Sequence, residues 1–475
     1  MSLPIIAEQL AALPPEIRAV VQSIIEYYER RISALEGELT ATKAELAAVR
    51  KTPQNSSLPP STQHPHAKPA SAKPRSKRQR GGQPGHPKHE RALIPTAECR
   101  DVFEHRPQHC RGCGAKLVGA DADPLRHQVW ELPEIKPLVD EHRLHRLTCG
   151  CGLVTCGVLP SGIPRGQAGP RLIAFTALLM GCFRQSKRKT AAFLSSLLNV
   201  PCSPGWVVKL QNHATAALRP SYDELVQQLP QQPQLNIDET PGKQGTLKMW
   251  MWGFVAATFT VFALRLSRKA VELYAFIGED FPGVVGCDRA KMYLRMERIQ
   301  WCWAHLLRDF QALIDSTDLQ AKRLGHDLQR QTQTMFTLWH RVRDGTLSRR
   351  VFQQQMKPIR LEVEALLLRG LFSGNRLFAG MCAELHHGRA NLWTFVDVEY
   401  VEPTNNSSER ALRHPVIWRK LSFGTQSDAG SRFVETILTV IETCRQTQQN
   451  SFAFVTQSIT AHFSGHPHPQ LLNGV

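Results

Sequence analysis

The chain has 475 residues, enough for about three domains, and its 58 Lys and Arg against 41 Asp and Glu give a net charge of +17. This excess predicts an anionic partner, with nucleic acid favoured over a membrane surface. The N-terminus lacks the pattern of a signal peptide, and the longest uncharged run, 249–264, is too short for a membrane span. The composition therefore argues against a membrane protein and favours a cytoplasmic one.

Residues 1–51 are predicted to form a helical dimerisation segment. Apolar side chains recur at alternating spacings of three and four from Ile25 to Val49, over about four heptads, with Thr42 in the polar position. This pattern is typical of a coiled coil, which would make the protein a homodimer or a larger oligomer. A single amphipathic helix lying on its own protein would give the same pattern.

Residues 52–92 are rich in Pro, Ser, Gln and Gly and carry many cations against one acid, Glu90. Such a segment cannot bury enough apolar surface to fold alone. We expect either a solvated tether or a linker whose cations contact DNA phosphates. The candidate DNA contacts are Arg75, Lys77, Arg78 and Arg80.

Residues 93–160 are predicted to form a zinc ribbon. Cys110 and Cys113 make one close pair and Cys149 and Cys151 a second, each beside glycines that permit tight turns. In a chain without an export signal, such pairs indicate zinc rather than disulfides. Four thiolates would leave no open position, so the Zn²⁺ would be structural. The second pair has only one intervening residue, and the alternative ligands are His145, Cys156 and Cys99.

Residues 161–230 are predicted to be helical, with helices over 184–198 and 204–218 joined by a turn. Ser203 suits the N-cap position, and Pro204 suits the first helical position. The order fits a DNA-binding helix-turn-helix, although helical hairpins without special function are commoner. The DNA-binding candidates in this segment are Lys187, Arg188 and Lys189.

Residues 231–475 are predicted to form an α/β domain. One apolar run carries Asp238 near its end, before a Pro-Gly turn, and a second run ends in Asp288. The intervening residues suggest one or two strands over 248–265 and a helix over 270–276. This is the order of an RNase H-like sheet, in which both carboxylates converge at one edge and bind Mg²⁺ or Mn²⁺. A turn cap is the alternative role of Asp238.

A further strand is predicted at 299–303, followed by a helical insertion at about 306–396 with breaks near Gly345, Pro358 and Gly374. A third acid is expected from a helix after the insertion. Glu409 is the candidate, with Arg410 and Arg413 beside it to hold phosphates. A capping box begun by Asn406 would also explain Glu409. The other candidate acids are Glu402, Glu435 and Glu442.

Together these motifs resemble the insertion-sequence-66 transposase family. The matching segments are Asn55-Ser-Ser-Leu-Pro-Pro-Ser61, Arg80-Gly-Gly-Gln-Pro-Gly-His86, Asp238-Glu-Thr240, Cys287-Asp-Arg-Ala-Lys-Met-Tyr293, Cys302-Trp-Ala-His-Leu-Leu-Arg-Asp-Phe310, Asn405-Asn-Ser-Ser-Glu-Arg-Ala-Leu-Arg413 and Arg419-Lys-Leu-Ser-Phe-Gly424. The likeness covers nearly the whole chain. It implies a multidomain α+β protein in the order coil, basic linker, zinc finger, helical region and catalytic domain.

The resemblance further implies a DDE transposase of a bacterial mobile element, with Asp238, Asp288 and Glu409 as a triad for two Mg²⁺ or Mn²⁺ ions. His305 lies in a matching motif, but packing beside tryptophans would also explain it. The enzyme would cut the 3′ side of the element's ends and join each 3′-OH to target DNA, with or without accessory proteins. Two other functions fit the same residues: an RNase H-like nuclease or resolvase without strand transfer, and a zinc-ribbon DNA-binding protein with an inactive catalytic domain.

Overall fold

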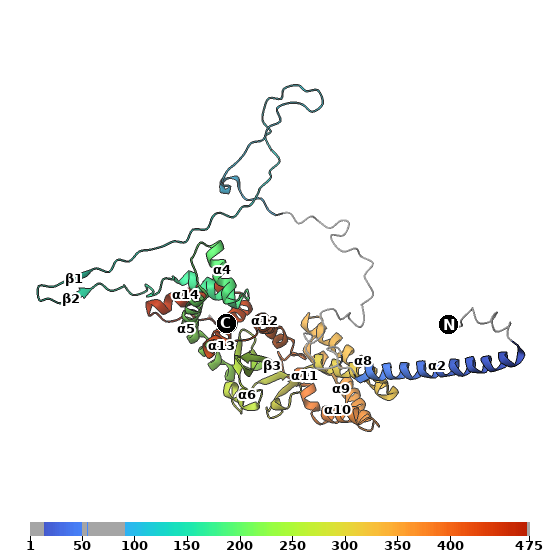
Figure 1. Cartoon of the computed structure of the whole chain (residues 1–475). Coiled ribbons are helices and arrows are strands. Elements are labelled where there is room, and N and C mark those ends of the chain that lie inside the picture. The colour runs from blue at the N-terminus through green and yellow to red at the C-terminus, as the bar shows by residue number, and fades with distance from the viewer. Residues whose placement is uncertain (1–13, 50–54, 56–90, 473–475) are drawn as a thin grey trace. The chain divides into compact units, whose positions relative to one another are not determined.

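The computed structural model describes residues 14–49, 55 and 91–472 (Figure 1). The chain divides into two compact units, one of residues 65–138 and the other of residues 1–64 with 139–475, and each is described by itself. The linker candidates Arg75, Lys77, Arg78 and Arg80 lie outside the described residues. Among the helices that the structure describes, none is long and apolar enough to cross a membrane.

A five-stranded mixed sheet forms the core of the larger unit, in the order β5-β4-β3-β6-β7. Its three antiparallel strands are β3 (Gln234–Gln244), β4 (Leu247–Val255) and β5 (Thr260–Arg265). On the other edge of β3, β6 (Val284–Cys287) and β7 (Ile299–Trp301) run parallel to it. The segment 248–265 thus forms two strands, because its aromatic and β-branched side chains are buried in the sheet.

Strand β3 is longer than the sequence suggested. It continues through Pro241 and Gly242 to pair Gln244 with Leu247, and the turn comes at Gly245, whose φ is 56°. Within the described sheet, β6 pairs with β3 only as far as Asn236, so a proline farther along interrupts no ladder on that side. The predicted Pro-Gly turn after the acidic pair is therefore wrong, and Asp238 lies inside a strand rather than capping a turn.

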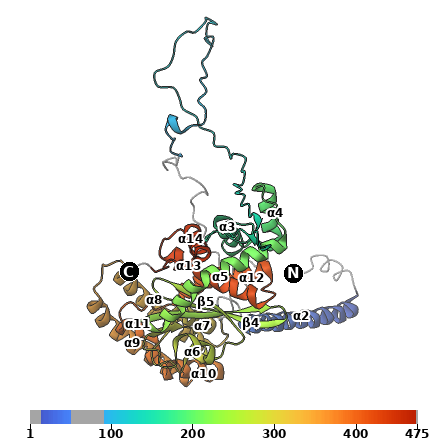
Figure 2. The same cartoon turned by 90° about the vertical axis from the view of Figure 1, so that its left-hand side faces the viewer.

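Helices cover both faces of the sheet (Figure 2). On one face lie α5 (Pro204–Gln228), α12 (Asn406–Ser422) and α13 (Asp428–Gln446), and on the other lies α6 (Ala270–Ile277), as the pattern predicted. Leu412 of α12 fills the space over Gly253 in β4, while Phe254, the next residue, packs against Phe276 of α6 in a tilted pair, at 4.7 Å between ring centroids. Successive side chains of β4 therefore serve opposite layers.

The segment 161–230 belongs to the same core as the sheet. Helices α3 (Pro170–Gly181), α5 and α14 (Ser451–Ser464) share one hydrophobic cluster with β5. The hydroxyl of Tyr222 in α5 donates to the carbonyl of Phe262 in β5 at 3.0 Å. The predicted domain boundary near residue 230 is therefore not a boundary between two cores.

The expected pair of helices in this segment is present with different limits. Helix α4 (Lys187–Leu197) starts after Arg184, whose φ of 58° places it outside the helix. Ser203 caps α5 as predicted, accepting from the backbone N–H of Trp206. Helix α5 buries one face on the core and leaves Lys209, Asn212 and His213 exposed, so a part for it in DNA binding stays a prediction.

The helical insertion is present and packs beside β7. Its breaks fall near Gly345 and Gly374 as predicted, but Pro358 lies inside a helix. Burial of the flanking Met356 and Ile359 offsets the cost of an interior proline, about 3 kcal/mol. The helices are α7 (Trp303–Ile314), α8 (Leu319–Arg343), α9 (Arg349–Leu371), α10 (Arg376–His387) and α11 (Thr394–Asp397).

The N-terminal segment contains one described helix, α2 (Pro15–Val49), while residues 1–13, 50 and 51 lie outside the described ones. Its seam side chains Ile32, Leu35 and Leu39 are 54%, 47% and 54% exposed, so this apolar stripe has no cover within the single chain that the structure describes. The pairing of the helix with a second copy stays a prediction.

Candidate active site

The register of two parallel strands brings Asp238 and Asp288 to the same edge of the sheet. Strand β3 pairs with β6 through Gln234 with Val284 and Asn236 with Gly286. Asp238 comes two residues after Asn236, and Asp288 comes two residues after Gly286. The two acids are therefore level with each other and on the same face of the sheet. Asp288 follows the last residue of β6, where the strand opens into a loop.

Helix α12 brings Glu409 to the same place, because its first residues are fastened to β3. The N-cap Asn405 is 1% exposed, and its side-chain amide donates to the carbonyl of Ile237 at 2.8 Å. The backbone N–H of Asn405 donates to Cys302 Sγ at 3.2 Å. These bonds join the start of α12 to the residue before Asp238 and to the start of α7.

The capping-box explanation of Glu409 does not hold. The N-cap is Asn405 rather than Asn406, so Glu409 is the fourth helical residue and not the third. The N–H that a capping carboxylate would accept from is already bonded to Cys302. In the described part of the chain, the buried Oε1 of Glu409 has no hydrogen-bond partner.

The carboxylates repel one another. Asp238 is surrounded by protein although part of its surface reaches solvent, and burial raises its pKa well above the usual range. The neighbouring carboxylates of Glu239, Asp288 and Glu409 raise this pKa further. Three acids acting on a fourth make a strongly negative site, the electrostatic setting that favours a bound cation.

Glu239 is a buried acid that sequence reasoning passed over. Its side chain is 2% exposed, forms an ion pair with Arg268 and accepts from the Tyr293 hydroxyl at 2.7 Å. Burial and then Asp288 raise its pKa to about 7, against the attraction of Arg268. Its place directly after Asp238 in an apolar run was the available signal.

Helix α7 places a cation, Arg308, and an imidazole, His305, beside the Glu409 carboxylate. His305 Nε2 and Arg308 Nη2 each lie 3.7 Å from Glu409 Oε1. Burial, followed by the nearby Arg308, lowers the pKa of His305, so the imidazole is neutral near pH 7. Arg289, the residue after Asp288, binds Asp309 at 2.7 Å and thereby fixes the loop of Asp288 to α7. The contact with Glu409 gives His305 a place in the site besides its packing.

The fallback acids are engaged elsewhere. Glu435 lies in the core between α13 and β5, bonded to Arg432 and to the N–H of Leu264. Glu442 pairs with Arg445, and Glu402 accepts from the indole of Trp339. Among the acids predicted after the insertion, Glu409 is the one that acts on Asp238.

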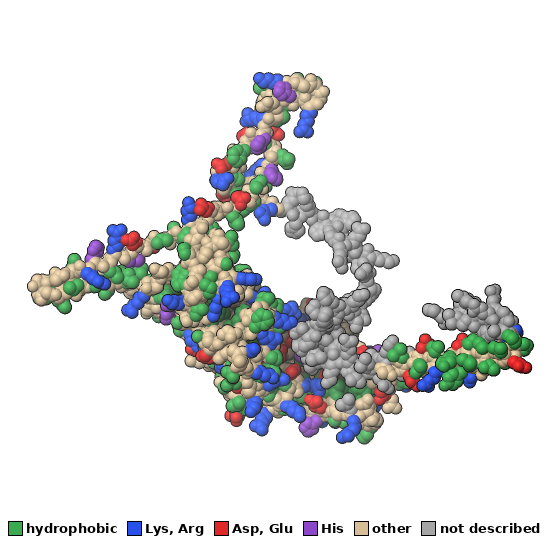
Figure 3. Space-filling model, in the orientation of Figure 1, with side chains coloured by type: hydrophobic (Ala, Val, Ile, Leu, Met, Phe, Trp, Pro, Cys, Tyr) green, Lys and Arg blue, Asp and Glu red, His purple; other side chains and the backbone are tan. Residues whose placement is uncertain are grey.

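The cationic candidates that the structure describes are on the surface. Lys187, Arg188 and Lys189 are exposed in the first turn of α4. Arg410 and Arg413 are exposed on α12, directly after Glu409. Figure 3 shows Lys and Arg side chains gathered over the region of α4 and α12.

The two cysteine pairs each occupy a tight turn. Gly114, at φ 73°, closes the turn of Cys110 and Cys113, and the N–H groups of Cys113 and then Gly112 lower the pKa of the Cys110 thiol. Cys149 and Cys151 lie between the short antiparallel strands β1 (Arg146–Thr148) and β2 (Val154–Cys156). The two pairs belong to different units.

No three His, Cys, Asp or Glu side chains in the described ranges have the spacing of a metal site. This holds for the thiols and for the carboxylates alike. The acids of the sheet edge nonetheless fit divalent cations chemically, because Mg²⁺ and Mn²⁺ prefer oxygen ligands and Glu409 offers a buried oxygen without a hydrogen bond among the described residues. For Zn²⁺ the structure shows the two turns but not a four-sulfur set.

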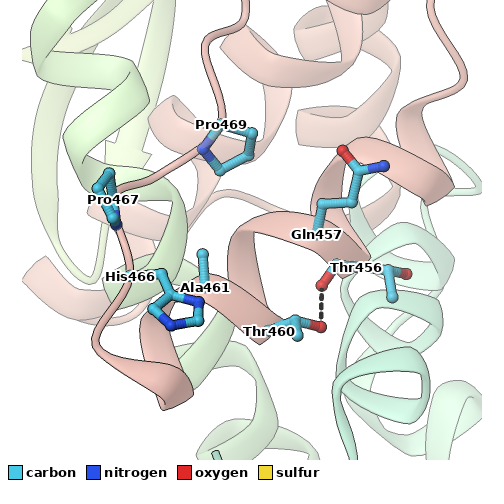
Figure 4. A pocket seen from close by; sticks show the side chains of 7 residues that line it. All are labelled: Thr456, Gln457, Thr460, Ala461, His466, Pro467 and Pro469. Atoms are coloured by element: carbon cyan, nitrogen blue, oxygen red, sulfur yellow. Dashed lines mark hydrogen bonds between the residues drawn. The ribbon is translucent and has the colours of Figure 1, made fainter.

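An open hollow of about 360 Å³ lies between α14 and the segment after it (Figure 4). The hydroxyl of Thr460 is engaged, donating to the carbonyl of Thr456 at 2.8 Å. His466 is the one titratable side chain in its lining, which is too little for acid–base chemistry. The carboxylate cluster is therefore the stronger candidate for an active site.

A central mixed sheet, helices on both faces and acids gathered at one edge are compatible with the class of α+β transposases. Residues 165–432 of the chain match the protein family described as "Transposase IS66 family", and the chain belongs to that family. It is also 23% identical over 399 residues to the uncharacterized protein y4qI of Sinorhizobium fredii (strain NBRC 101917 / NGR234), covering 76% of this chain and 71% of the relative.

Membership confirms the family resemblance drawn from the motifs. The family implies DNA as the partner and suggests a DNA-cutting enzyme, and DDE transposases generally use divalent metals. The relative is similar in sequence and adds no chemistry of its own.

Proposed function

We propose that the chain is a DDE transposase that cuts the ends of a bacterial insertion sequence and joins the freed 3′-OH ends to target DNA. The observation that supports this proposal is that the carboxylates of Asp288 and Glu409 act on Asp238. Asp288 follows the strand parallel to β3 at the level of Asp238, and Glu409 lies on a helix fastened to β3. The strand order, antiparallel over β5-β4-β3 and parallel over β3-β6-β7, supports an RNase H-like catalytic domain.

Asp238, Asp288 and Glu409 are the residues that would hold two Mg²⁺ or Mn²⁺ ions. When bound, such ions supply an activated nucleophile and neutralise charge on the phosphate in transit. The chain's own contribution is placement. Asn405 sets the start of α12 against β3, while His305 and Arg308 hold the Glu409 carboxylate from the side of α7.

The surface cations support DNA as the substrate. Lys187, Arg188 and Lys189 lie at the positive end of the α4 dipole. Their charges repel one another and the dipole, which destabilises the isolated protein, and a bound phosphate would offset this repulsion. Arg410 and Arg413 follow Glu409 within about one helical turn, within reach of phosphates that flank a cut. The cations of the linker would add contacts to the same strands.

The N-terminal helix is proposed to pair with a second copy of the chain. Gly37 lies inside this helix and destabilises it by about 1 kcal/mol relative to alanine, and a lone helix without packing is marginal in water. An exposed apolar stripe on such a helix favours a coiled-coil partner.

A structural Zn²⁺ on Cys110, Cys113, Cys149 and Cys151 is proposed for the ribbon, because each pair already sits in a turn with glycine. Protein purified without chelator should contain close to one zinc per chain, and Cys110→Ser should lose it. Cys444→Ser, at a buried thiol of α13, is the control that should keep it. Zinc-free protein with an intact fold would overturn this assignment.

The test of function uses a labelled duplex that carries one end of the element encoding the chain, with Mn²⁺ and a target plasmid. We expect a nick at the 3′ side of the end and then a joined product, both lost in Asp238→Asn. Cutting without joining would identify a nuclease or resolvase. DNA binding without either product would identify a DNA-binding protein with an inactive site.

A further inference from the structure

Helix α12 carries an exposed stripe that leads away from the carboxylate site. Its side chains recur at helical spacing and are all exposed, and we call them the α12 stripe: Arg410, Arg413, Ile417, Lys420 and Leu421. His414, beside the stripe, donates from Nε2 to the carbonyl of Gly181 at 2.8 Å. The basic first turn of α4 begins a few residues after Gly181, at Lys187. Glu409 stands at one end of the stripe, and Phe423 stands at the other.

The backbone conformation and the exposure of Phe423 are both energetically unfavourable. It takes the C-cap position of α12 in the left-handed conformation, at φ 58° and ψ 23°, where glycine or asparagine is usual. Its side chain is 80% exposed. An aromatic residue with both a disfavoured backbone and an unburied ring gains nothing from the folded chain that the structure describes.

The backbone around Phe423 is fixed rather than loose. Its N–H donates to the carbonyl of Arg419 at 2.8 Å, and two residues on Thr425 donates to the carbonyl of Lys243 at 2.9 Å. A Cβ on the intervening Gly424 would come within 2.4 Å of that same carbonyl oxygen. The ring is thus presented to solvent from a rigid junction of α12 with the β3–β4 hairpin.

We infer that Phe423 stacks on an unpaired base of the bound DNA, at the far end of the α12 stripe from Glu409. The proposal rests on the proposed function, since it takes DNA as the ligand. The cations of the stripe would bind the backbone that leads from the cut, and aromatic stacking suits any base because every base has a flat face. Phe423 is fourteen positions after Glu409, about 21 Å along a helix, which corresponds to about six base steps of roughly 3.4 Å.

Two exposed aromatic residues serve as matched controls. Phe372 caps the end of α9 with a ring that is 87% exposed, but at an ordinary φ of −91°. Tyr400 has a φ of 65° and is 85% exposed, yet it lies between α11 and α12, outside the α12 stripe. One control matches the residue type and helix position, and the other matches the backbone and the exposure.

The experiment measures binding of a fluorescent forked duplex of arbitrary sequence, with a paired stem and unpaired arms that contain 2-aminopurine. No Mg²⁺ or Mn²⁺ is added, so that no cutting contributes, and no chelator is used, so that any bound Zn²⁺ stays in place. We expect Phe423→Ala and Phe423→Gly to weaken binding of the fork about tenfold and to abolish the 2-aminopurine response, with a smaller loss on fully paired DNA. Phe423→Trp should bind like the wild type, as should Phe372→Ala and Tyr400→Ala.

Thermal unfolding provides the check on folding. Phe423→Gly should unfold at the wild-type temperature or above it, because glycine accepts the left-handed conformation. Binding of the fork by a folded Phe423→Ala within twofold of the wild type would overturn the inference. So would a smaller sedimenting species for Phe423→Ala, since the ring would then contact a second copy of the chain. Failure of cutting and joining with Mn²⁺ would count against the proposed function and leave this binding result standing.

Discussion

In the proposed metal site, the charge of the Glu409 side chain matters more than its shape. Its buried Oε1 makes no hydrogen bond within the described residues and lies 3.7 Å from Arg308 Nη2, and the carboxylate adds to the negative field at Asp238. Glutamine has the same size but could not hold a divalent cation with the same strength. The first prediction follows from this difference.

We predict that Glu409→Gln folds and binds DNA but loses cutting and joining by roughly 100-fold or more. The measurement is the rate of nicking of a labelled element end with Mn²⁺. Glu442→Gln changes an acid that pairs with Arg445, and it should cut at the wild-type rate. Nicking by Glu409→Gln within a few-fold of wild type would end the assignment.

Glu435 has a different role, since it is a core acid far along α13. Burial raises its pKa to about 7, against the attraction of Arg432. The folded protein therefore keeps a proton on this group that the unfolded chain releases near pH 4.5. Because the folded pKa is the higher one, the contribution of Glu435 to stability is present below the unfolded pKa and is lost as pH rises toward 7.

We predict that the free energy of unfolding of the wild type, minus that of Glu435→Gln, falls by up to about 1.4 kcal/mol per pH unit between roughly pH 4.5 and 7. Urea titrations of both proteins across this range measure it. Taking the difference cancels His305 and His414, whose lowered pKa values act with the opposite sign. A difference that is flat with pH would show that Glu435 stays ionised in the fold.

Among the elements, α2 shows the largest contrast between its sequence pattern and its surroundings. Its seam is apolar, yet Leu35 and Leu39 are about half exposed. We predict that the full chain sediments as a dimer or larger and that Leu35→Lys with Leu39→Lys shifts it to the monomer. Ser33→Lys, on the same helix but off the seam, should leave the assembly unchanged. A wild-type monomer at tens of micromolar would contradict the coiled coil.

The strands and their acids could be predicted because local pattern determines them. The apolar runs that end near Asp238 and Asp288 become adjacent parallel strands. The role of Asn405 was hidden, since an Asn before a helix is usually a cap and nothing local indicates its bond to Ile237. Pro358 and the burial of α5 depended on long-range packing, which outweighs local propensity.

For the whole molecule, the net charge of +17 predicts binding that depends strongly on salt. With several phosphate contacts, affinity for duplex DNA should fall about a thousandfold between roughly 50 and 200 mM salt. Changing Lys187, Arg188 and Lys189 to Gln should reduce the slope of log affinity against log salt by about 2 to 3. Anisotropy titrations measure both quantities.

The control for this slope removes the same charge from the helical insertion. Arg350, Lys357 and Arg376 are exposed there, and their change to Gln should leave the slope near its original value. Equal effects of the two triple variants would mean that the charge acts only as a diffuse field. A response that is flat with salt would mean that the positive charge serves another partner.

Helix α12 is tied to β3 at both of its ends, through Asn405 to Ile237 and through Thr425 to Lys243. One extra residue in α12 between these hydrogen bonds would rotate the rest of the helix by about 100° about its axis and move it by about 1.5 Å along the axis. The two segments therefore cannot change length independently, whereas the turns at Gly345 and Gly374 can. Across homologous chains, insertions and deletions should collect in the helical insertion and be absent from 237–243 and 405–425.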